Sequence, residues 1–153
     1  MRSLGAEAFF DVTKYTRDQA GSDALAADVK AATRHGMGAA SVIVCAGANA
    51  AYAQALSFLN FGGSLVCLGF PEGGAPVPIP DAFPGNIIAR ELHILGSAVG
   101  NRKEAIETLD MAARGVIKTH FTLEPMSKLA DVFERMGRME LQGRVVVDMS
   151  REE

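Results

Sequence analysis

The residues best suited to contact a ligand lie in small, glycine-containing turns that follow apolar runs. The clearest turn begins after Leu95, where Gly96-Ser97-Ala98-Val99-Gly100 leads into a helix-like segment. Glycine in such a turn lets a flat ligand approach the backbone closely. Shorter turns follow Ala46 and Leu68. None has the Gly-x-Gly-x-x-Gly spacing of a phosphate-binding loop, so an ordinary turn at a strand end is the simpler interpretation.

Other reactive side chains show no spacing typical of catalysis. His35, His93 and His120 are far apart in the sequence, and His93 is expected to be a structural histidine rather than a ligand. Cys45 and Cys67 lie in apolar runs without the paired spacing of a zinc site, and we expect buried free thiols. No Gly-x-Ser-x-Gly motif supports a serine nucleophile. An α/β enzyme that uses the three histidines is therefore the least favoured interpretation.

Composition favours one globular, cytoplasmic chain. Of the 153 residues, 48% are hydrophobic and 22% are charged, with a net charge of -3. These values argue against a disordered tail and against a nucleic-acid partner. The apolar runs have the length of strands, so no membrane span is expected. We also expect no signal peptide, because the N-terminal residues Met1 to Gly5 lead directly into sequence typical of folded structure.

Strand-like and helix-like segments alternate along the chain. The expected strands cover residues 8–12, 40–47, 64–70, 91–97, 116–123 and 144–148. The expected helices begin at Ser22 or Asp23 and run to residue 34, then cover residues 50–59, 102–114 and 128–139, with a loop at 71–80 and a helical turn within 81–88. Asn101 is expected to cap the helix at 102–114, with Ala105, Leu109 and Ala112 facing inward. The helix at 128–139 is expected to carry one apolar stripe, formed by Leu129, Val132, Phe133 and Met136. Alternation predicts a parallel α/β sheet with right-handed crossovers. The continuous apolar runs predict strands covered on both faces, with ligands at their carboxyl ends.

Several collinear segments resemble the C-terminal part of zinc-type, medium-chain alcohol dehydrogenases, especially the yeast-like fungal group. The matching segments are Arg2-Ser3-Leu4-Gly5-Ala6-Glu7, Leu68-Gly69-Phe70-Pro71, Gly96 to Arg102, Ala113 to Lys118 and Gly143 to Asp148. The resemblance implies an incomplete Rossmann-like parallel sheet with flanking helices that lacks the first two strands, plus a C-terminal helix-strand segment. It implies a partial dinucleotide-binding domain at residues 1–117. Residues 118–153 would return to the catalytic domain.

The resemblance also implies contacts with NAD on one side of the sheet and from the last strand. Val12 would lie at the adenine edge, and Ala46 would lie beside a ribose. The family has serine at the position of Ala46, so only a contact of its backbone is implied there. Arg144 would bring a guanidinium toward the pyrophosphate. Without the resemblance, Val12 and Ala46 would be interpreted as core residues and Arg144 as a surface arginine.

The nicotinamide half of the cofactor would be contacted by backbone groups. Leu68 and Phe70 would approach the nicotinamide-side ribose, and Ser97 and Val99 would bond the carboxamide. Leu68 and Val99 would otherwise be interpreted as ordinary core residues.

The function implied is that of a truncated NAD-dependent zinc alcohol dehydrogenase that is inactive alone. In the family, the zinc ligands and the glycine-rich phosphate loop lie in the part that precedes these residues, so no catalytic residue and no metal ligand is assigned here. The alternative is a non-catalytic nucleotide-binding or oligomerisation module. The resemblance also implies that residues 92–99 form an oligomer edge, which pairs antiparallel with its two-fold mate in a homo-oligomer. The strand expected at residues 8–12 would lack its neighbour, and either pair with the strand at Ile43 or pack irregularly.

Overall fold

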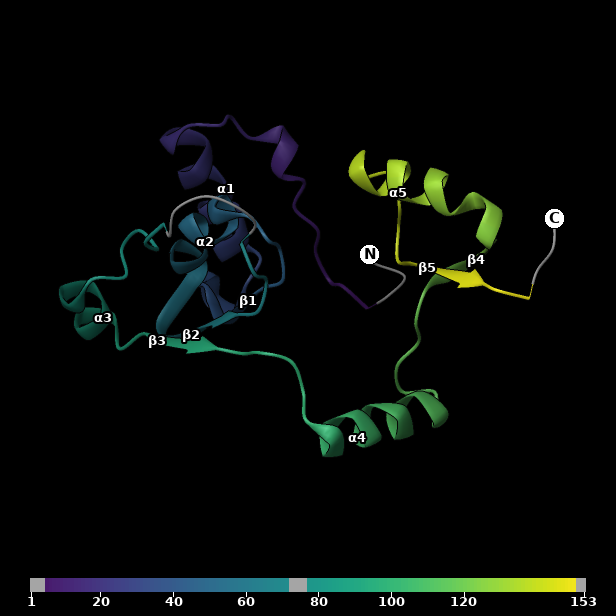
Figure 1. Cartoon of the computed structure of the whole chain (residues 1–153). Coiled ribbons are helices and arrows are strands. Elements are labelled where there is room, and N and C mark those ends of the chain that lie inside the picture. Colours follow the sequence, from purple (N-terminus) through teal and green to yellow (C-terminus); the bar gives the residue numbers. More distant parts are fainter. Residues whose placement is uncertain (1–4, 72–76, 151–153) are drawn as a thin grey trace. The chain divides into compact units, whose positions relative to one another are not determined.

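The computed structural model describes residues 5–71 and 77–150 (Figure 1). The resemblance at residues 2–4 and the middle of the expected loop, residues 72–76, lie outside the described residues. The chain forms two compact units, Met1–Val99 and Gly100–Glu153. The domain boundary at residue 117 refers to a longer parent enzyme and stays a prediction.

The first unit contains a three-stranded parallel sheet. Its strands are β1 (Ala39–Val44), β2 (Leu59–Cys67) and β3 (His93–Gly96), in the order β1-β2-β3. The register aligns Ile43 with Val66, and Val66 with Leu95. These strands confirm the predicted parallel α/β class. β2 begins earlier than expected, because Leu59 pairs with Ala39 before a register shift, after which Ser41 pairs with Ser64.

Two helices of this unit connect its strands, and a third precedes them. They are α1 (Gln19–Ala31), α2 (Asn49–Ala55) and α3 (Pro84–Arg90), with short 3-10 turns at Val12–Lys14, Arg34–Gly36 and Leu56–Phe58. The expected start of α1 at Ser22 or Asp23 was wrong. Asp18 caps the helix by accepting a hydrogen bond from the amide of Gly21 at 2.8 Å, and a side chain at Gly21 would overlap the Thr16 carbonyl.

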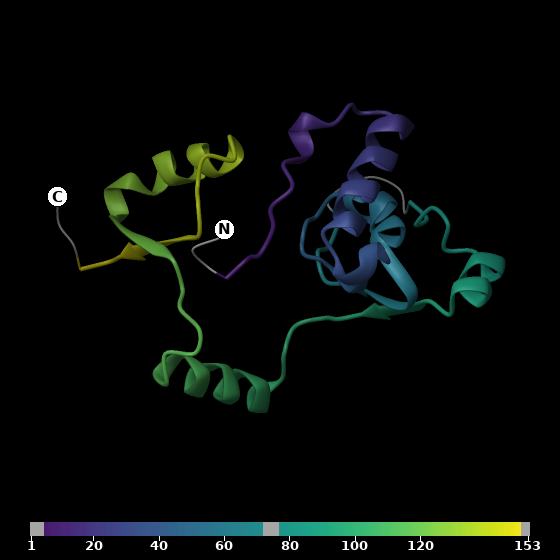
Figure 2. The same cartoon turned by 180° about the vertical axis from the view of Figure 1, so that it is seen from behind.

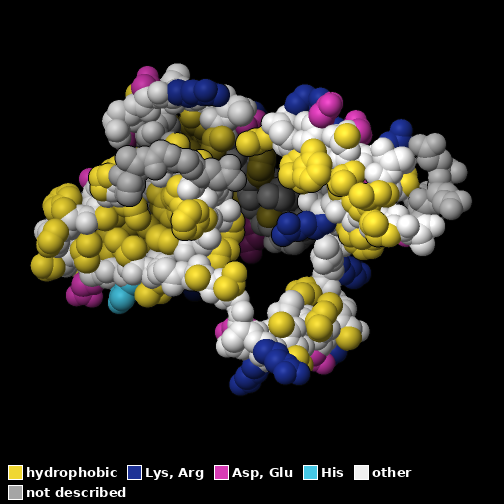
Figure 3. All heavy atoms as spheres, in the orientation of Figure 1, with side chains coloured by type: hydrophobic (Ala, Val, Ile, Leu, Met, Phe, Trp, Pro, Cys, Tyr) yellow, Lys and Arg dark blue, Asp and Glu magenta, His cyan; other side chains and the backbone are white. Residues whose placement is uncertain are grey.

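The core of the first unit lies on one face of the sheet. It is built from Val44, Tyr52, Ala55, Leu56, Leu59, Leu65 and Leu92. Right-handed crossovers place α2 and α3 on that same face. On the other face, Ile43 and Leu95 remain 60% and 51% exposed. The expectation that the strands are covered on both faces was therefore wrong, and Figure 3 shows broad apolar surface on this unit.

Residues 8–12 do not form the expected strand. Residues 8–11 have no regular structure, and Val12 begins a 3-10 turn that Asp11 caps through the amide of Thr13 at 3.0 Å. A strand needs a hydrogen-bonded neighbour, and residues 8–12 pair with none of the described strands, although the outer edge of β1 is unpaired. The alternative of irregular packing is the one observed.

The second unit pairs two parallel strands. It contains α4 (Arg102–Ala113), β4 (Phe121–Pro125), a 3-10 turn at Met126–Lys128, α5 (Leu129–Gly137) and β5 (Arg144–Asp148) (Figure 2). β4 and β5 align Phe121 with Arg144. The predicted terminal strand is confirmed, whereas the strand expected at 116–123 begins only at Phe121, because only the residues opposite β5 find a partner.

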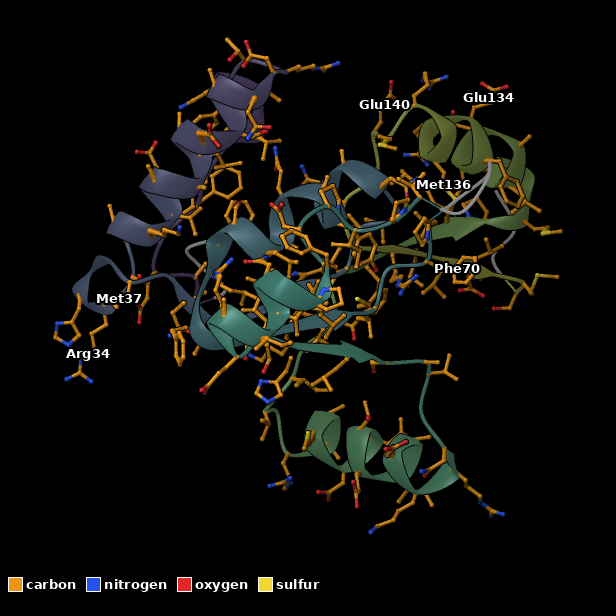
Figure 4. The ribbon with its side chains drawn as sticks, turned by 90° about the vertical axis from the view of Figure 1, so that its left-hand side faces the viewer. Arg34, Met37, Phe70, Glu134, Met136 and Glu140 are labelled. Carbon is orange, nitrogen blue, oxygen red and sulfur yellow. The ribbon has the colours of Figure 1, made fainter. Side chains whose placement is uncertain are left out.

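The apolar faces expected on the two helices of this unit are largely uncovered. In α4 no described side chain is buried, including Ala105, Leu109 and Ala112, which were expected to face inward. In α5 only Val132 of the expected stripe is buried, while Phe133 and Met136 are exposed (Figure 4). Local periodicity predicted these helices correctly, but no described element of the unit is large enough to cover their faces.

Candidate functional site

The carboxyl ends of the three strands are tied together by backbone hydrogen bonds. The carbonyl of Val44 accepts bonds from the amides of Leu68, at 3.1 Å, and Gly69, at 2.7 Å. The carbonyl of Cys67 accepts a bond from the amide of Ser97 at 3.0 Å. The turns that follow β1, β2 and β3 therefore form one edge, which is where open α/β sheets bind ligands.

Gly69 allows the turns after β1 and β2 to pack against each other. A side chain at Gly69 would overlap the carbonyl of Ala46, so the turns after β1 and β2 approach each other at a distance that only glycine permits. The hydroxyl of Tyr52 on α2 donates a hydrogen bond to the Gly69 carbonyl. Burial, followed by the proximity of Cys67 and Cys45, raises the pKa of Tyr52, which therefore stays a donor at neutral pH.

The larger cavity at this edge brings three predicted cofactor residues together. Leu68, Phe70 and Ser97 line a space of about 640 Å³, together with Tyr52 of α2 and the apolar loop residues 77–80. Burial raises the pKa of the Cys67 thiol, which also lines this space. The volume and apolar lining are typical of a small-molecule site.

A second cavity brings together two further predicted residues of this unit. Val12 and Ala46 line a space of about 370 Å³, with Phe9, Val42 and Gln54 among the other lining residues. Its lining is mainly apolar, which suits a flat aromatic group better than a phosphate.

The remaining predicted residues lie outside both cavities. Val99 is 98% exposed and has a positive φ of 28°. Arg144 is an exposed residue of β5, in the second unit. Phe70 lines the larger cavity but is 88% exposed (Figure 4). Val12, Ala46, Leu68 and Val99 are all exposed, so the alternative interpretation of them as ordinary core residues was wrong.

Tyr52 is the site residue that the sequence analysis missed. It lies in the first turn of α2, the helix that follows β1. The first turn of such a helix lies at the carboxyl edge of the sheet, and this rule is the signal that could have found Tyr52.

The reactive side chains give no metal centre. Among the described residues, no group of three or more histidines, cysteines or acids could hold a metal ion. His35, His93 and His120 are all exposed, so the expectation of a structural, packed His93 was wrong. Both cysteines are free, but Cys45 is exposed and Cys67 half-buried, which corrects the expectation of two buried thiols. No helix within the described ranges is long and apolar enough to cross a bilayer.

Parallel strands joined by right-handed crossovers, with cavities at their carboxyl ends, define a partial Rossmann-like α/β fold. Residues 1–114 match the model of one family, described as zinc-binding dehydrogenase. The chain belongs to this family. The resemblance to zinc-type medium-chain alcohol dehydrogenases is thereby confirmed.

The curated relatives are much longer than this chain. Alcohol dehydrogenase 2 of Emericella nidulans is 50% identical over 98% of this chain and 40% of its own length. Alcohol dehydrogenase 1 of Neurospora crassa is 38% identical over 98% of this chain and 39% of its own length. The chain thus spans about two-fifths of the curated relatives that it matches.

Solved structures share the fold. The alcohol dehydrogenase of the archaeon Aeropyrum pernix superposes with a TM-score of 0.75 and 26% identity, over 95% of this chain and 38% of its own. Acetophenone reductase of Geotrichum candidum, solved in complex with NAD, superposes with a TM-score of 0.61 over 72% of this chain and 31% of its own; at 19% identity it supports the fold alone.

Proposed function

We propose that this chain carries the cofactor-facing strand ends of an NAD-dependent zinc alcohol dehydrogenase and has no alcohol dehydrogenase activity by itself. The observation that carries the proposal is the shared edge of β1, β2 and β3, where the Val44 and Cys67 carbonyls tie the three turns together. Its cavities contain five of the seven residues that the resemblance implies: Val12, Ala46, Leu68, Phe70 and Ser97. We also propose that the chain works in the cytoplasm.

The two cavities suit the two aromatic ends of a nicotinamide dinucleotide. The larger cavity has an apolar wall beside Leu68 and Ser97, whose amides already donate to the Val44 and Cys67 carbonyls, so it would hold the nicotinamide ring and exclude water from it. The smaller cavity beside Val12 and Ala46 would hold the adenine. NAD, when bound, supplies the carbon that accepts a hydride. Val99 and Arg144 stay predicted contacts, for the carboxamide and the pyrophosphate.

The first test is a fluorescence titration of the purified chain with NADH, with size analysis alongside. Saturable binding in the micromolar range by a discrete species is expected. Ala46→Glu should weaken this binding, because it places a carboxylate in the apolar smaller cavity. Ile106→Glu, on exposed α4, is the matched control and should bind NADH as the parent does. Absence of binding up to millimolar NADH would contradict the proposal.

A second test measures catalysis. The purified chain, supplied with NAD, zinc and a series of small alcohols, should produce no NADH above background. In this proposal the zinc and the proton-transfer groups belong to parts of the parent enzyme that the chain does not span. Robust zinc-dependent alcohol oxidation would overturn the claim of inactivity.

The second candidate function is an oligomerisation module. β3 is a terminal strand of its sheet, and within the described residues only β2 pairs with it. Its outer edge would pair, through residues 92–99, with a second copy or with a full-length relative. Sedimentation of the chain with and without such a relative discriminates the two candidates: association through β3 without NADH binding favours the module.

A further inference from the structure

One residue in the turn after β2 is hydrogen-bonded by the two elements that precede that strand. The amide of Gly69 donates to the Val44 carbonyl of β1 at 2.7 Å, and the carbonyl of Gly69 accepts a hydrogen bond from the hydroxyl of Tyr52. Tyr52 belongs to α2. The backbone of Gly69 is therefore held at its amide by a strand and at its carbonyl by a helix.

Side-chain packing does little to fix this turn. Phe70 is 88% exposed and Leu68 is 49% exposed, so neither side chain is anchored in the core. Gly69, between them, has no side chain. The position of the turn therefore depends on the hydrogen bonds of its backbone, and Tyr52 supplies one of them from a buried side chain.

The ring and the hydroxyl of Tyr52 have separate roles. The ring belongs to the buried core cluster that includes Ala55, Leu56 and Leu65, and the residue is only 8% exposed. A phenylalanine ring would fill nearly the same volume, whereas a buried hydroxyl costs free energy unless it forms a hydrogen bond. Packing therefore accounts for the ring, and the bond to Gly69 accounts for the hydroxyl.

The turn that Tyr52 contacts belongs to the wall of the larger cavity. Leu68, Gly69 and Phe70 all line that cavity. The smaller cavity is lined by Val12 and Ala46 and by none of these three residues. A displacement of the turn would therefore change the larger cavity most, which is where the proposed function places the nicotinamide ring.

We propose that Tyr52 is a positioning residue for the nicotinamide end of the cofactor. Through its bond to the Gly69 carbonyl, the hydroxyl fixes Leu68 and Phe70 at the wall of the larger cavity, and the affinity for this end of NADH depends on their position. The identity of the ligand rests on the proposed function. The effect of the hydroxyl on the turn does not, because it is a property of the chain without a ligand.

The first measurement compares Tyr52→Phe with the parent in the absence of a ligand. The variant keeps the ring and removes the hydroxyl. Hydrogen exchange at the amides of Leu68 and Gly69, which both donate to Val44, should become about fivefold faster, the factor expected for the loss of one hydrogen bond. Exchange at Leu65, in the middle of β2, should be unchanged. Unchanged exchange at Leu68 and Gly69 would overturn the proposal.

Tyr15→Phe is the matched control. Tyr15 is the other tyrosine of the chain, and its hydroxyl donates to Asp28 at 2.7 Å, away from the residues that line the two cavities. This variant should leave exchange at Leu68 and Gly69 as it is in the parent. Faster exchange of these two amides in both variants would contradict a specific role of Tyr52.

The second measurement separates positioning from a general loss of stability. Tyr52→Phe should bind NADH at least fivefold more weakly than the parent, by fluorescence titration. It should bind AMP, which lacks the nicotinamide end, with unchanged affinity in an NMR titration, because AMP needs only the smaller cavity. Unchanged binding of NADH, or equal weakening of NADH and AMP, would overturn the proposal.

The two measurements also distinguish this inference from the proposed function. If the parent itself fails to bind NADH, the proposed function is contradicted. The exchange comparison then decides whether Tyr52 fixes the turn: faster exchange at Leu68 and Gly69 supports that role, and unchanged exchange refutes it.

Discussion

At the scale of single residues, the site depends on the backbone contact between Gly69 and Ala46. Gly69→Ala would drive a methyl group into the Ala46 carbonyl and force the two turns apart. We expect a loss of about 1–3 kcal/mol in the free energy of unfolding, as overpacked positions show, together with weaker NADH binding. Urea unfolding measures the first effect and fluorescence titration the second.

Gly96 provides the matched control for this experiment. It also lies at a strand end and lines the same cavity, but nothing lies within 4 Å of the position of an added methyl group. Gly96→Ala should therefore unfold at nearly the parent's urea concentration. If the two alanine variants are equally stable, the close approach of Gly69 to Ala46 does not contribute to the free energy of unfolding.

The cap of α1 adds a pH dependence. Hydrogen bonds from Thr16 and from the amide of Gly21 lower the pKa of Asp18 below its ordinary value of 3.8. A lowered pKa means that the stabilisation is present above about pH 4 and is lost as the pH falls through the folded-state value. Asp18→Asn keeps a good cap but does not titrate, so its stability should depend less on pH between 5 and 2. Thermal unfolding of the parent and of Asp18→Asn across this pH range checks the difference. Identical pH profiles would show that Asp18 does not cause the pH dependence.

At the scale of elements, α4 depends on its own cap because none of its described side chains is buried. Asn101 accepts bonds from the amides of Lys103 and Glu104, and Glu104 accepts one from the amide of Asn101 at 2.6 Å. Asn101→Ala should cost about 1 kcal/mol and speed hydrogen exchange throughout the helix. Thr108→Ala, in mid-helix, is the control and should leave exchange unchanged or slower. Unchanged exchange in Asn101→Ala would show that packing, not the cap, holds the helix.

Arg135 holds α5 against β4. Its guanidinium lies 3.0 Å from Glu124 of β4 and 2.9 Å from Asp131 of its own helix, although the geometry at Nε is too poor for a hydrogen bond to Asp131. Glu124 and Arg135 are both more than two-thirds buried. Arg135→Met should therefore cost about 1–3 kcal/mol, since it leaves Glu124 without its charged partner. Arg138→Met, whose ion pairs with Glu134 and Glu140 are exposed, should cost much less (Figure 4). Hydrogen exchange of the β4 amides measures the loss of stability in both variants, and equal losses would contradict this prediction.

Elements were predictable where the signal is local. The runs around Ile43, Val66 and Leu95 identified the three strands, and Asn101 identified the start of α4. The strand at residues 8–12 and the covered faces of α4 were predicted wrongly, because pairing and burial depend on neighbours that no local pattern specifies. In the site, the family resemblance, and not a local pattern, supplied Leu68, Phe70 and Ser97. Tyr52 was missed because its contact with Gly69 is made across the fold.

At the scale of the whole molecule, many large apolar side chains lie at the surface. Phe9, Ile43, Phe61, Leu95 and Phe133 are each more than half exposed. We therefore expect strong binding of a hydrophobic dye and self-association that increases with protein concentration and with salt. Dye fluorescence and sedimentation velocity check this expectation, and a monodisperse monomer without dye binding would contradict it.

The parallel pairing of every described strand also has a consequence for how fast the chain reaches its fold. All three pairings, β1 with β2, β2 with β3 and β4 with β5, join residues at least twenty positions apart, and none is a hairpin. Each pairing must close a long loop before it gains any hydrogen bond, so there is no short-range β nucleus. Refolding should therefore be slow for a chain of this length. During this time apolar strands such as β1 stay unpaired, and a ribosome or a chaperone can still reach them.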